Sequence, residues 1–155
     1  MPLLAIAYCS QVSPGVSLLQ IDELAEKASA HNLNTGVTGV LLTDGKRFLQ
    51  YIEGPEQGVA AAYLRITSAS SHLRLVELGR SVGAARRFPH WSMRWLAVEP
   101  EDLRIAEVSD WRGLATRQEV SMFQVPTGIE CVTALINPYI GCERPPGCIC
   151  GDCRW

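Results

Sequence analysis

Three side chains that could take part in chemistry each lie in an otherwise apolar row of an expected strand: Tyr8, Gln50 and Met93. Strand side chains alternate between two faces, so each of the three shares its face with apolar neighbours. A buried primary amide has two donors and an acceptor, and leaving such groups unpaired costs about 1–3 kcal/mol. If the three rows face one way, the phenol could donate to the amide, and the amide could pass a hydrogen bond to a ligand. A phenol can also give an electron and a proton to a photoexcited or oxidised partner.

A plainer interpretation of the same residues stays open on spacing alone. Tyrosine and methionine are common in cores, and Gln50 could be partly exposed or bonded to nearby backbone. Asn32 and His31 lie where the first expected helix ends. Asparagine often caps or turns the chain at such a place, and histidine there is usually at the surface. The sequence contains no P-loop and no evident Ser-His-Asp or Cys-His set, so it shows no standard catalytic motif.

The elements around these residues are expected in the order β-α-β-β-α-β-β. Periodicity and turn residues predict a strand over residues 3–10, a helix that begins at Ser17, strands over 36–43 and 47–55, a helix from Pro55 to about 68, and strands over 73–78 and 91–98. Ser17 and Gln20 have the spacing of a capping box, which favours a helix start. Asp44-Gly45 is a strong two-residue hairpin signal that leads into the strand of Gln50.

This order is typical of an α+β, ferredoxin-like fold with one added strand, followed by a short C-terminal extension. Because β-α-β crossovers are right-handed, both helices are expected on one face of a five-stranded mixed sheet. The space between two such helices is a natural cleft for a flat ligand. In the last strand, alternation predicts Trp91, Met93 and Trp95 on one face. Residues 100–111 are expected to form a short amphipathic helix, and residues 117–136 a further helical or extended piece.

The composition limits the class of protein. A chain of 155 residues has room for one domain and a short appendage, and with 47% apolar and 19% charged residues it is globular. The net charge of −2 and the scattered basic residues argue against nucleic acid as the main partner. No apolar run approaches the length of a membrane span, and the first residues lack the basic region of a signal peptide. A cytoplasmic protein with reduced thiols is therefore expected.

A cluster of cysteines near the end of the sequence could bind a metal: Cys142, Cys148, Cys150 and Cys153. Cys150 and Cys153 form a C-x-x-C motif, and four thiolates could make a tetrahedral zinc site. An iron–sulfur cluster is a further possibility, although the spacing matches none of the common iron–sulfur patterns. A tail with reduced, unliganded thiols is the alternative, because a single C-x-x-C without a matching second pair is a weak signal.

Taken together, several stretches resemble the BLUF domain, a blue-light sensor that uses a flavin. The stretches that carry the resemblance are Tyr8-Cys9-Ser10, His31-Asn32 followed by Gly36-Val37-Thr38-Gly39, Phe48 to Gly54, and Arg87-Phe88-Pro89 leading to Trp91-Ser92-Met93. Their order and spacing agree over about residues 2–98. The resemblance implies a flavin-binding photosensor domain over residues 1–98 and an output segment with a cysteine-rich tail over residues 99–155.

The resemblance further implies that an oxidised flavin, usually FAD, binds non-covalently between the two helices. Tyr8 would give an electron and a proton to the excited flavin, and Gln50 would be the switch residue whose hydrogen bonds rearrange. Trp91 and Met93 would relay the change to the fifth strand. The residues implied to contact the flavin are Tyr8, His31, Asn32, Gln50, Arg65, His72 and Met93. Since nothing is consumed, the implied role is sensing and not enzyme catalysis.

One position departs from the family pattern and bears on the choice of cofactor. BLUF proteins often have a basic residue just before the histidine that precedes the fourth strand, whereas here Ser71 precedes His72. FMN and riboflavin therefore stay open beside FAD, with Arg65 as a cation that could compensate.

The expected partners are the flavin and a downstream protein, reached through the C-terminal segment or across a homodimer or higher homo-oligomer. Two rival functions stay open. One is a flavin-dependent redox enzyme, against which the lack of a nicotinamide-binding fingerprint weighs. The other is a metal-binding interaction module that uses the cysteine tail.

Overall fold

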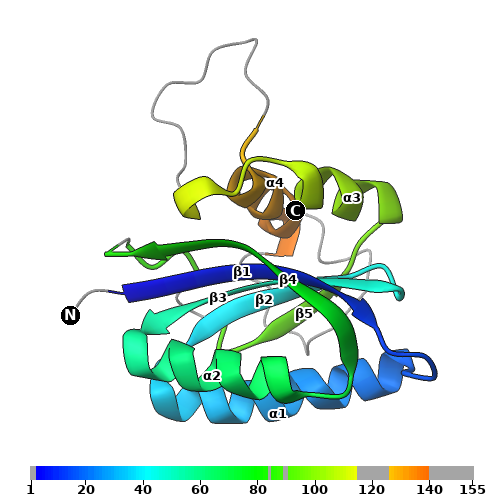
Figure 1. Ribbon diagram of the computed structural model, residues 1–155, viewed down its shortest axis with the longest axis horizontal. Helices are drawn as coiled ribbons and strands as arrows, with labels where there is room; N and C mark the ends of the chain where they lie inside the picture. The colour runs from blue at the N-terminus through cyan, green and yellow to red at the C-terminus, as the bar shows by residue number, and fades with distance from the viewer. Residues whose placement is uncertain (1–2, 84, 89–90, 115–125, 140–155) are drawn as a thin grey trace.

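The computed structural model describes residues 3–83, 85–88, 91–114 and 126–139. Its first seven elements follow the predicted order: β1 (Leu3–Val12), α1 (Leu18–Thr35), β2 (Thr38–Thr43), β3 (Arg47–Pro55), α2 (Glu56–Ser68), β4 (His72–Val82) and β5 (Arg94–Ala97). They are followed by α3 (Pro100–Val108), the 3-10 turn η1 (Arg112–Leu114), α4 (Gly128–Ile136) and the 3-10 turn η2 (Asn137–Tyr139). Figure 1 shows α1 and α2 on one face of the sheet and α3 and α4 on the other. The predicted ferredoxin-like α+β arrangement is confirmed.

The sheet is mixed and its strand order is β4-β1-β3-β2-β5. β1 pairs antiparallel with both β3 and β4, whereas β2 pairs antiparallel with β3 and parallel with β5. In the β1–β3 register Tyr8 stands opposite Gln50, and on the other side of β3 Leu41 stands opposite Gln50. Directly opposed residues of neighbouring strands point to the same face, so the register alone brings the phenol beside the amide.

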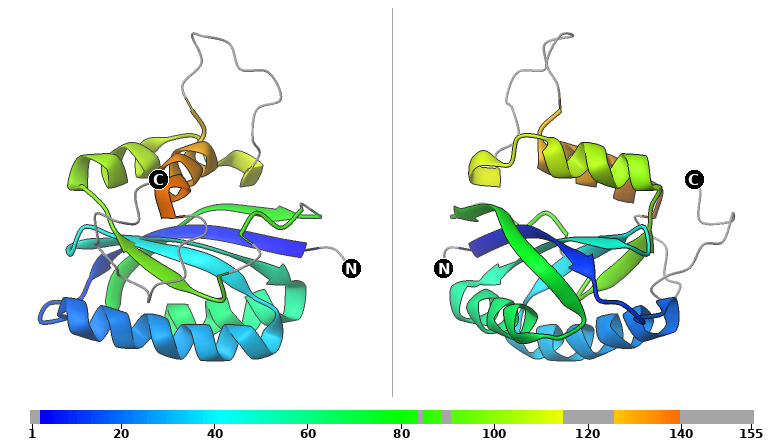
Figure 2. Two further views of the ribbon diagram at one scale, coloured as in Figure 1. Left: turned by 180° about the vertical axis from the view of Figure 1, so that it is seen from behind. Right: turned by 45° about the vertical axis from the view of Figure 1, so that its right-hand side comes forward.

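Local signals in the sequence fix both ends of α1. The Oγ of Ser17 accepts from the backbone N–H of Gln20, and the Gln20 side chain accepts from the backbone N–H of Ser17, so the predicted capping box forms. Gly36 ends the helix in the left-handed conformation, with φ at 72°, which glycine adopts without steric cost. α2 follows β3 directly, with Pro55 at its N-cap. Both helices lie along the same face of the sheet (Figure 2).

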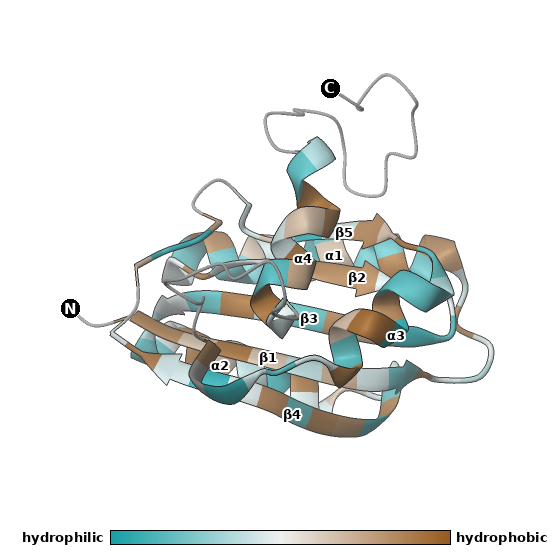
Figure 3. Ribbon diagram, turned by 90° about the horizontal axis from the view of Figure 1, so that it is seen from above, coloured by the Kyte–Doolittle hydropathy of each residue, from teal (hydrophilic) through white to brown (hydrophobic). Residues whose placement is uncertain are grey.

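Each face of the sheet has its own apolar core. The core on the α1/α2 face includes Ile6, Ile21, Ile52 and Val59. The core on the α3/α4 face includes Tyr51, Leu103, Trp111 and Ile129. Figure 3 shows α3 and α4 lying over the sheet with hydrophobic stretches in both helices. In the described part of the chain, no helix combines the length and the apolarity that crossing a membrane requires.

β1 and β2 each differ from the prediction by two residues at one end, and the bounds of β4 and β5 differ more. β4 continues past its predicted end to Val82, because it pairs with β1 along nearly its whole length. β5 is limited to Arg94–Ala97, and the strand alternation does not extend back to Trp91. Trp91 packs against the α3/α4 core, whereas Met93 and Trp95 belong to the α1/α2 core. The prediction that these three residues share one face is therefore wrong for Trp91.

A buried carboxylate fastens the connector between β4 and β5 to the sheet. Glu53 is 1% exposed and accepts from the Tyr51 hydroxyl at 2.7 Å. It also accepts from the backbone N–H groups of Arg87 and Phe88, each at 2.6 Å. These three bonds satisfy a group that would otherwise be costly to bury, and they position the segment that leads to Met93.

Candidate functional site

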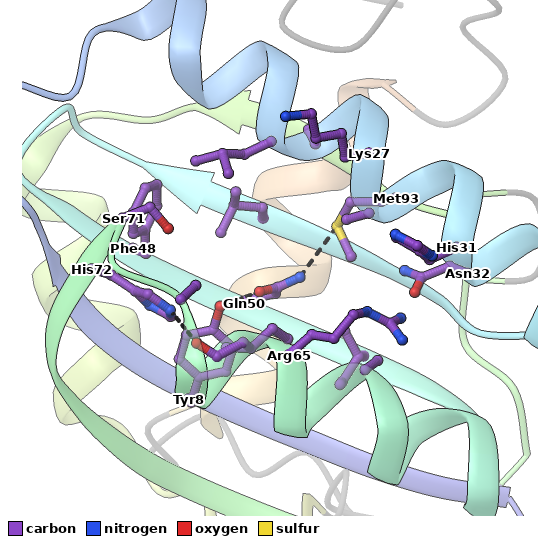
Figure 4. Close-up of a pocket in the computed structure, with 18 residues that line it drawn as sticks. Tyr8, Lys27, His31, Asn32, Phe48, Gln50, Arg65, Ser71, His72 and Met93 are labelled. Carbon is purple, nitrogen blue, oxygen red and sulfur yellow. Dashed lines mark hydrogen bonds between the residues drawn. The ribbon is translucent and has the colours of Figure 1, made fainter.

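A cavity of about 260 Å³ lies between α1, α2 and the sheet. Its volume approaches the ~300–1,000 Å³ of typical small-ligand pockets. Figure 4 shows side chains from both helices and from the strands converging on it. Most of the lining is apolar and includes Leu24, Ala28, Leu41, Phe48, Ile52 and Ala62. A slot of this kind suits a flat ligand with an apolar face.

The floor of the cavity holds two consecutive hydrogen bonds centred on Gln50 (Figure 4). The Tyr8 hydroxyl donates to Oε1 of Gln50, and Nε2 of Gln50 donates to Sδ of Met93 at 3.4 Å. The three residues are between 2% and 5% exposed. The bonds formed among the described residues use the acceptor of the amide and one of its two donors. The second N–H is therefore available to a ligand above the floor.

The environment of Tyr8 keeps its phenol protonated. Burial raises the pKa of Tyr8, and the neighbouring Tyr63 adds to the rise. The two rings lie edge to face with centroids 6.2 Å apart. The neutral phenol therefore persists at neutral pH. Its hydrogen bond to Gln50 gives the phenolic proton an acceptor whenever the ring loses an electron.

His72 lies beside Tyr8, with ring centroids 5.8 Å apart, and both of its ring nitrogens have partners. Nε2 is 2.6 Å from the backbone carbonyl oxygen of Ile66, and Nδ1 is 2.9 Å from Oγ of Ser10. A carbonyl oxygen can only accept, so Nε2 carries the hydrogen. The Ser10 hydroxyl can either donate to Nδ1 or accept from it, so this contact is satisfied in each protonation state of the ring. The two bonds thereby fix the orientation of the ring beside the phenol.

Polar bonds join α1 to the segment that leads into β5. Asn32 is 2% exposed, and its Nδ2 donates to the backbone oxygen of Ser92 at 2.7 Å. The hydroxyls of Ser29 and Ser92 are 2.5 Å apart. Farther along, the indole N–H of Trp95 donates to Oδ1 of Asp22 at 2.8 Å. The Ser92 oxygen takes one of the two N–H groups of Asn32, so the second N–H and the amide oxygen are what Asn32 can offer to a ligand in the cavity.

Two cations border the cavity from facing helices. Lys27 of α1 and Arg65 of α2 both line it and are exposed (Figure 4), as is His31. Exposed cations attract phosphate groups, and an arginine can do so with two parallel hydrogen bonds. An apolar slot with amides on its floor and cations at its edge fits a flat heteroaromatic ring that carries a phosphate chain, and a flavin nucleotide is such a group.

The structure brings together all the residues predicted to contact a flavin. Every one of them lines this cavity: Tyr8, His31, Asn32, Gln50, Arg65, His72 and Met93. Their contact with a flavin stays a prediction. Trp91 does not line the cavity and stacks on Phe88 on the opposite face, with ring centroids 6.5 Å apart. Lys27 was missed, because it lies on the charged face of the first helix, where lysine usually faces only solvent.

The predicted metal ligands lie outside the described residues: Cys142, Cys148, Cys150 and Cys153. Within the described ranges, no group of three or more His, Cys, Asp or Glu side chains could hold a metal ion. Cys9 and Cys131, which lie within those ranges, are free thiols. The metal site in the cysteine tail therefore stays a prediction.

Comparison with known proteins adds a family match. Residues 3–94 match the model of the BLUF family, described as sensors of blue-light using FAD. The chain is also 32% identical over 123 residues to the blue light- and temperature-regulated antirepressor BluF of Escherichia coli strain K12. That alignment covers 79% of this chain and 29% of the relative, so the chain spans less than a third of that protein's length.

Solved structures of similar proteins have the same fold. The dark-state structure of BlrB, a BLUF protein, is 32% identical with a TM-score of 0.59, and the match covers 61% of this chain and 72% of BlrB. The structure of Klebsiella pneumoniae BlrP1 with FMN and cyclic diGMP is 39% identical with a TM-score of 0.57. That match covers 61% of this chain and 26% of BlrP1.

Proposed function

The chain belongs to the BLUF family, and from that premise we propose that it is a blue-light photoreceptor that holds a flavin non-covalently between α1 and α2. BLUF domains are sensory modules, so the role of the domain is sensing and not turnover of a substrate. The observation that carries the finer proposal is the chain of hydrogen bonds from Tyr8 through Gln50 to Met93 beneath the cavity. An oxidisable group, a group that can both accept and donate, and a polarisable acceptor are thereby in contact.

When bound, the flavin supplies the absorption of blue light and an acceptor for one electron and one proton. Tyr8 gives up an electron and its phenolic proton, the proton leaving toward Gln50, and it takes both back when the cycle closes. The Gln50 amide rearranges during this cycle. Its oxygen and nitrogen ends are alike in shape, so the rearrangement needs little space but exchanges a donor for an acceptor toward each neighbour. Tyr8, Met93 and the ligand then meet a different partner, which biases the surrounding packing.

We propose FAD as the cofactor, with FMN and riboflavin as the alternatives. Lys27 and Arg65 offer positive charge to a phosphate group, whereas Ser71, which also lines the cavity, offers only a hydroxyl. The BlrP1 structure that resembles this chain contains FMN. Phosphate binding and ring binding thus involve separate residues. Asn32 and Gln50 would bind the ring whether the cofactor is FAD, FMN or riboflavin.

The proposed output is the C-terminal segment, residues 99–155, with residues 1–98 as the photosensor. The described helices of that segment, α3 and α4, pack on the face of the sheet opposite the cavity. A change in the sheet would therefore reach them, and from there a partner protein or a second copy of the chain. The name of the similar antirepressor from Escherichia coli suggests that the partner is a downstream protein.

Absorption spectra before and after blue light test the proposed photochemistry on the wild type, Tyr8→Phe and Gln50→Leu. We expect a yellow protein, a reversible red shift in the wild type and no normal shift in either variant, since each variant removes one end of the Tyr8–Gln50 bond. Tyr63→Phe is the matched control. It removes a second phenol that lies near Tyr8 but does not line the cavity, so it should keep the shift.

Two results would contradict the proposal. One is a purified chain that is colourless and takes up no added FAD, FMN or riboflavin. The other is a Tyr8→Phe variant whose red shift equals that of the wild type, because its floor has lost the only hydroxyl hydrogen that Gln50 accepts among the described residues.

A further inference from the structure

We propose that Arg94 couples the flavin site to the C-terminal helices by holding its guanidinium between the rings of Trp91 and Tyr139. The inference rests on the proposed function, because it names the residues through which the state of that site would reach the end of η2. Arg94 does not line the cavity. Its role is that of a positioning residue, which acts through the neighbours it holds.

Arg94 is linked to the site by the backbone, as the next residue after Met93. Met93 accepts the N–H of Gln50 and directly precedes Arg94, the first residue of β5. Successive residues of an extended chain point to opposite faces. Accordingly, Met93 belongs to the α1/α2 core, whereas Arg94 stands opposite Val40, a residue of the α3/α4 core. A shift of Met93 on the cavity face therefore moves the backbone that anchors Arg94 on the far face.

Aromatic rings enclose the guanidinium on the far face. Its central carbon lies 4.9 Å from the ring centroid of Trp91 and 5.9 Å from that of Tyr139. Arg94 is 4% exposed, so these contacts form where water is largely excluded and attraction between a cation and a ring is strongest. Trp91 in turn stacks on Phe88 with an angle of 14° between the ring planes. The group Phe88–Trp91–Arg94–Tyr139 is a continuous stack, and we call it the Arg94 stack.

Tyr139 connects the Arg94 stack to the C-terminal layer. It lies in η2, which directly follows α4. A planar guanidinium makes its best ring contacts in a limited set of orientations, so a small displacement of Arg94 weakens the contact with Tyr139. A rearranged bond between Gln50 and Met93 would therefore change how firmly η2 and the end of α4 are held on the sheet.

Two other attachments of the C-terminal layer begin away from Met93. Arg47, at the start of β3, pairs with Glu107 of α3 at 2.6 Å. Nη2 of Arg87 donates to the backbone oxygen of Leu114 in η1 at 3.1 Å. These contacts reach α3 and η1, whereas the Arg94 stack reaches η2. They should hold the layer in darkness and in light alike, and the Arg47–Glu107 pair therefore provides a control.

Hydrogen–deuterium exchange on the full chain with bound flavin, in darkness and under blue light, tests the coupling, and absorption spectra of the same samples report on the site. In the wild type we expect light to change the amide exchange rates of residues 129–139. Tyr139→Leu removes one ring of the stack and should reduce that light-dependent change by roughly fivefold, the lower end of ordinary allosteric coupling, while the red shift persists. Arg94→Lys keeps the charge without the planar group and should act in the same direction.

Two control variants separate coupling from simple attachment. Tyr139→Phe keeps the ring and should match the wild type. Glu107→Gln removes the ion pair of α3, so it should raise exchange in α3 in both states and leave the light-dependent change at residues 129–139 unaltered. A full light-dependent change in both Tyr139→Leu and Arg94→Lys, or its loss in Tyr139→Phe, would overturn the coupling. A wild type without any red shift would instead overturn the proposed function, so the two failures are distinguishable.

Discussion

The two faces of the sheet are packed in opposite ways. On the α3/α4 face the layers are in such close contact that a Cβ atom at Gly128 would overlap the ring of Trp111, and one at Gly79 would overlap the Trp111 carbonyl. On the α1/α2 face, a cavity of about 260 Å³ separates the helices above Gln50. Dense packing favours stability, whereas a cavity lined by polar groups favours a ligand. The same sheet thus has a tightly packed α3/α4 face and an α1/α2 face with an open site.

The contrast is repeated by two polar residues of β3. Glu53 faces the α3/α4 layer and accepts three hydrogen bonds, from one hydroxyl and two backbone N–H groups. Gln50 faces the cavity, and the described residues leave one of its N–H groups for a ligand. A fully bonded polar group holds the structure in one arrangement, and a partly bonded one can change partners. Burial alone, 1% against 5% exposed, does not distinguish them.

Removing the centre of the tightly packed face should have the largest effect on stability. Trp111 is 5% exposed, contacts Gly128, and its indole N–H donates to the Ala106 oxygen at 2.7 Å. Trp111→Ala should lower the free energy of unfolding by about 3–5 kcal/mol, measured by urea denaturation. Val108→Ala on the exposed side of α3 is the control and should change it by less than about 0.5 kcal/mol. A loss below about 1 kcal/mol for Trp111→Ala would show that the two faces differ less than their packing indicates.

Replacing each of the two polar residues of β3 in turn should show that Glu53 supports stability and Gln50 supports photochemistry. Glu53→Ala leaves three donors, two of them buried, without their acceptor and should lower the free energy of unfolding by about 3 kcal/mol, at roughly 1 kcal/mol for each unmade bond. Gln50→Leu leaves only the Tyr8 hydroxyl without its partner and should change it by about 1 kcal/mol or less, yet abolish the red shift. Urea denaturation and light-minus-dark spectra on both variants are the measurements. Equal losses of stability would contradict the distinction between a structural and a switching polar group.

A smaller, pH-dependent effect should come from Cys9, which follows Tyr8 on β1 and faces the opposite layer. Burial, followed by the neighbouring Glu107 carboxylate, raises the pKa of the Cys9 thiol from 9.0 to about 11. A raised pKa means that folding favours the protonated thiol, so its contribution to stability is complete below pH 9 and is lost as the pH rises from 9 to 11. The slope should stay well below the ~1.4 kcal/mol per pH unit of one full proton, because solvent reaches the half-buried thiol and screens the interaction. Cys9→Ala should flatten this part of the curve in urea denaturation between pH 8 and 11, and identical slopes would contradict the assignment.

Alternation along strands was enough to predict the floor of the site. Tyr8 and Gln50 lie on one face because their strands are regular and pair in register, and the sequence shows that regularity directly. Trp91 was placed on the wrong face because the chain leaves the strand pattern before Arg94, where contacts with Phe88 and Arg94 decide its position. Such long-range packing has no local signal in the sequence.

The remaining gaps in the prediction have the same origin. Glu53 stood in an apolar row, which was a usable sign of a buried carboxylate, but its backbone partners in the β4–β5 connector depend on tertiary structure. Lys27 lies on the charged face of α1, and only the position of α2 reveals that this part of the helix borders a cavity. The packing of α4 on the sheet likewise follows from the close approach of Gly128 to Trp111 and from no feature of the helix alone.

The fixed ring of His72 has a consequence for how often the proposed photoreceptor could work. Histidine is the side chain that most readily takes up a proton near neutral pH, and this one stands next to the phenol of Tyr8. Ser10 and Ile66 are the hydrogen-bond partners of its two nitrogens, and the hydroxyl of Tyr8 bonds to Gln50 and not to this ring. Because the one hydrogen bond that the Tyr8 hydroxyl donates among the described residues goes to Gln50, the proposed proton transfer would have one direct route out and back. A reaction that returns every particle to its origin leaves no damaged residue behind, and the same molecule can respond to light again and again.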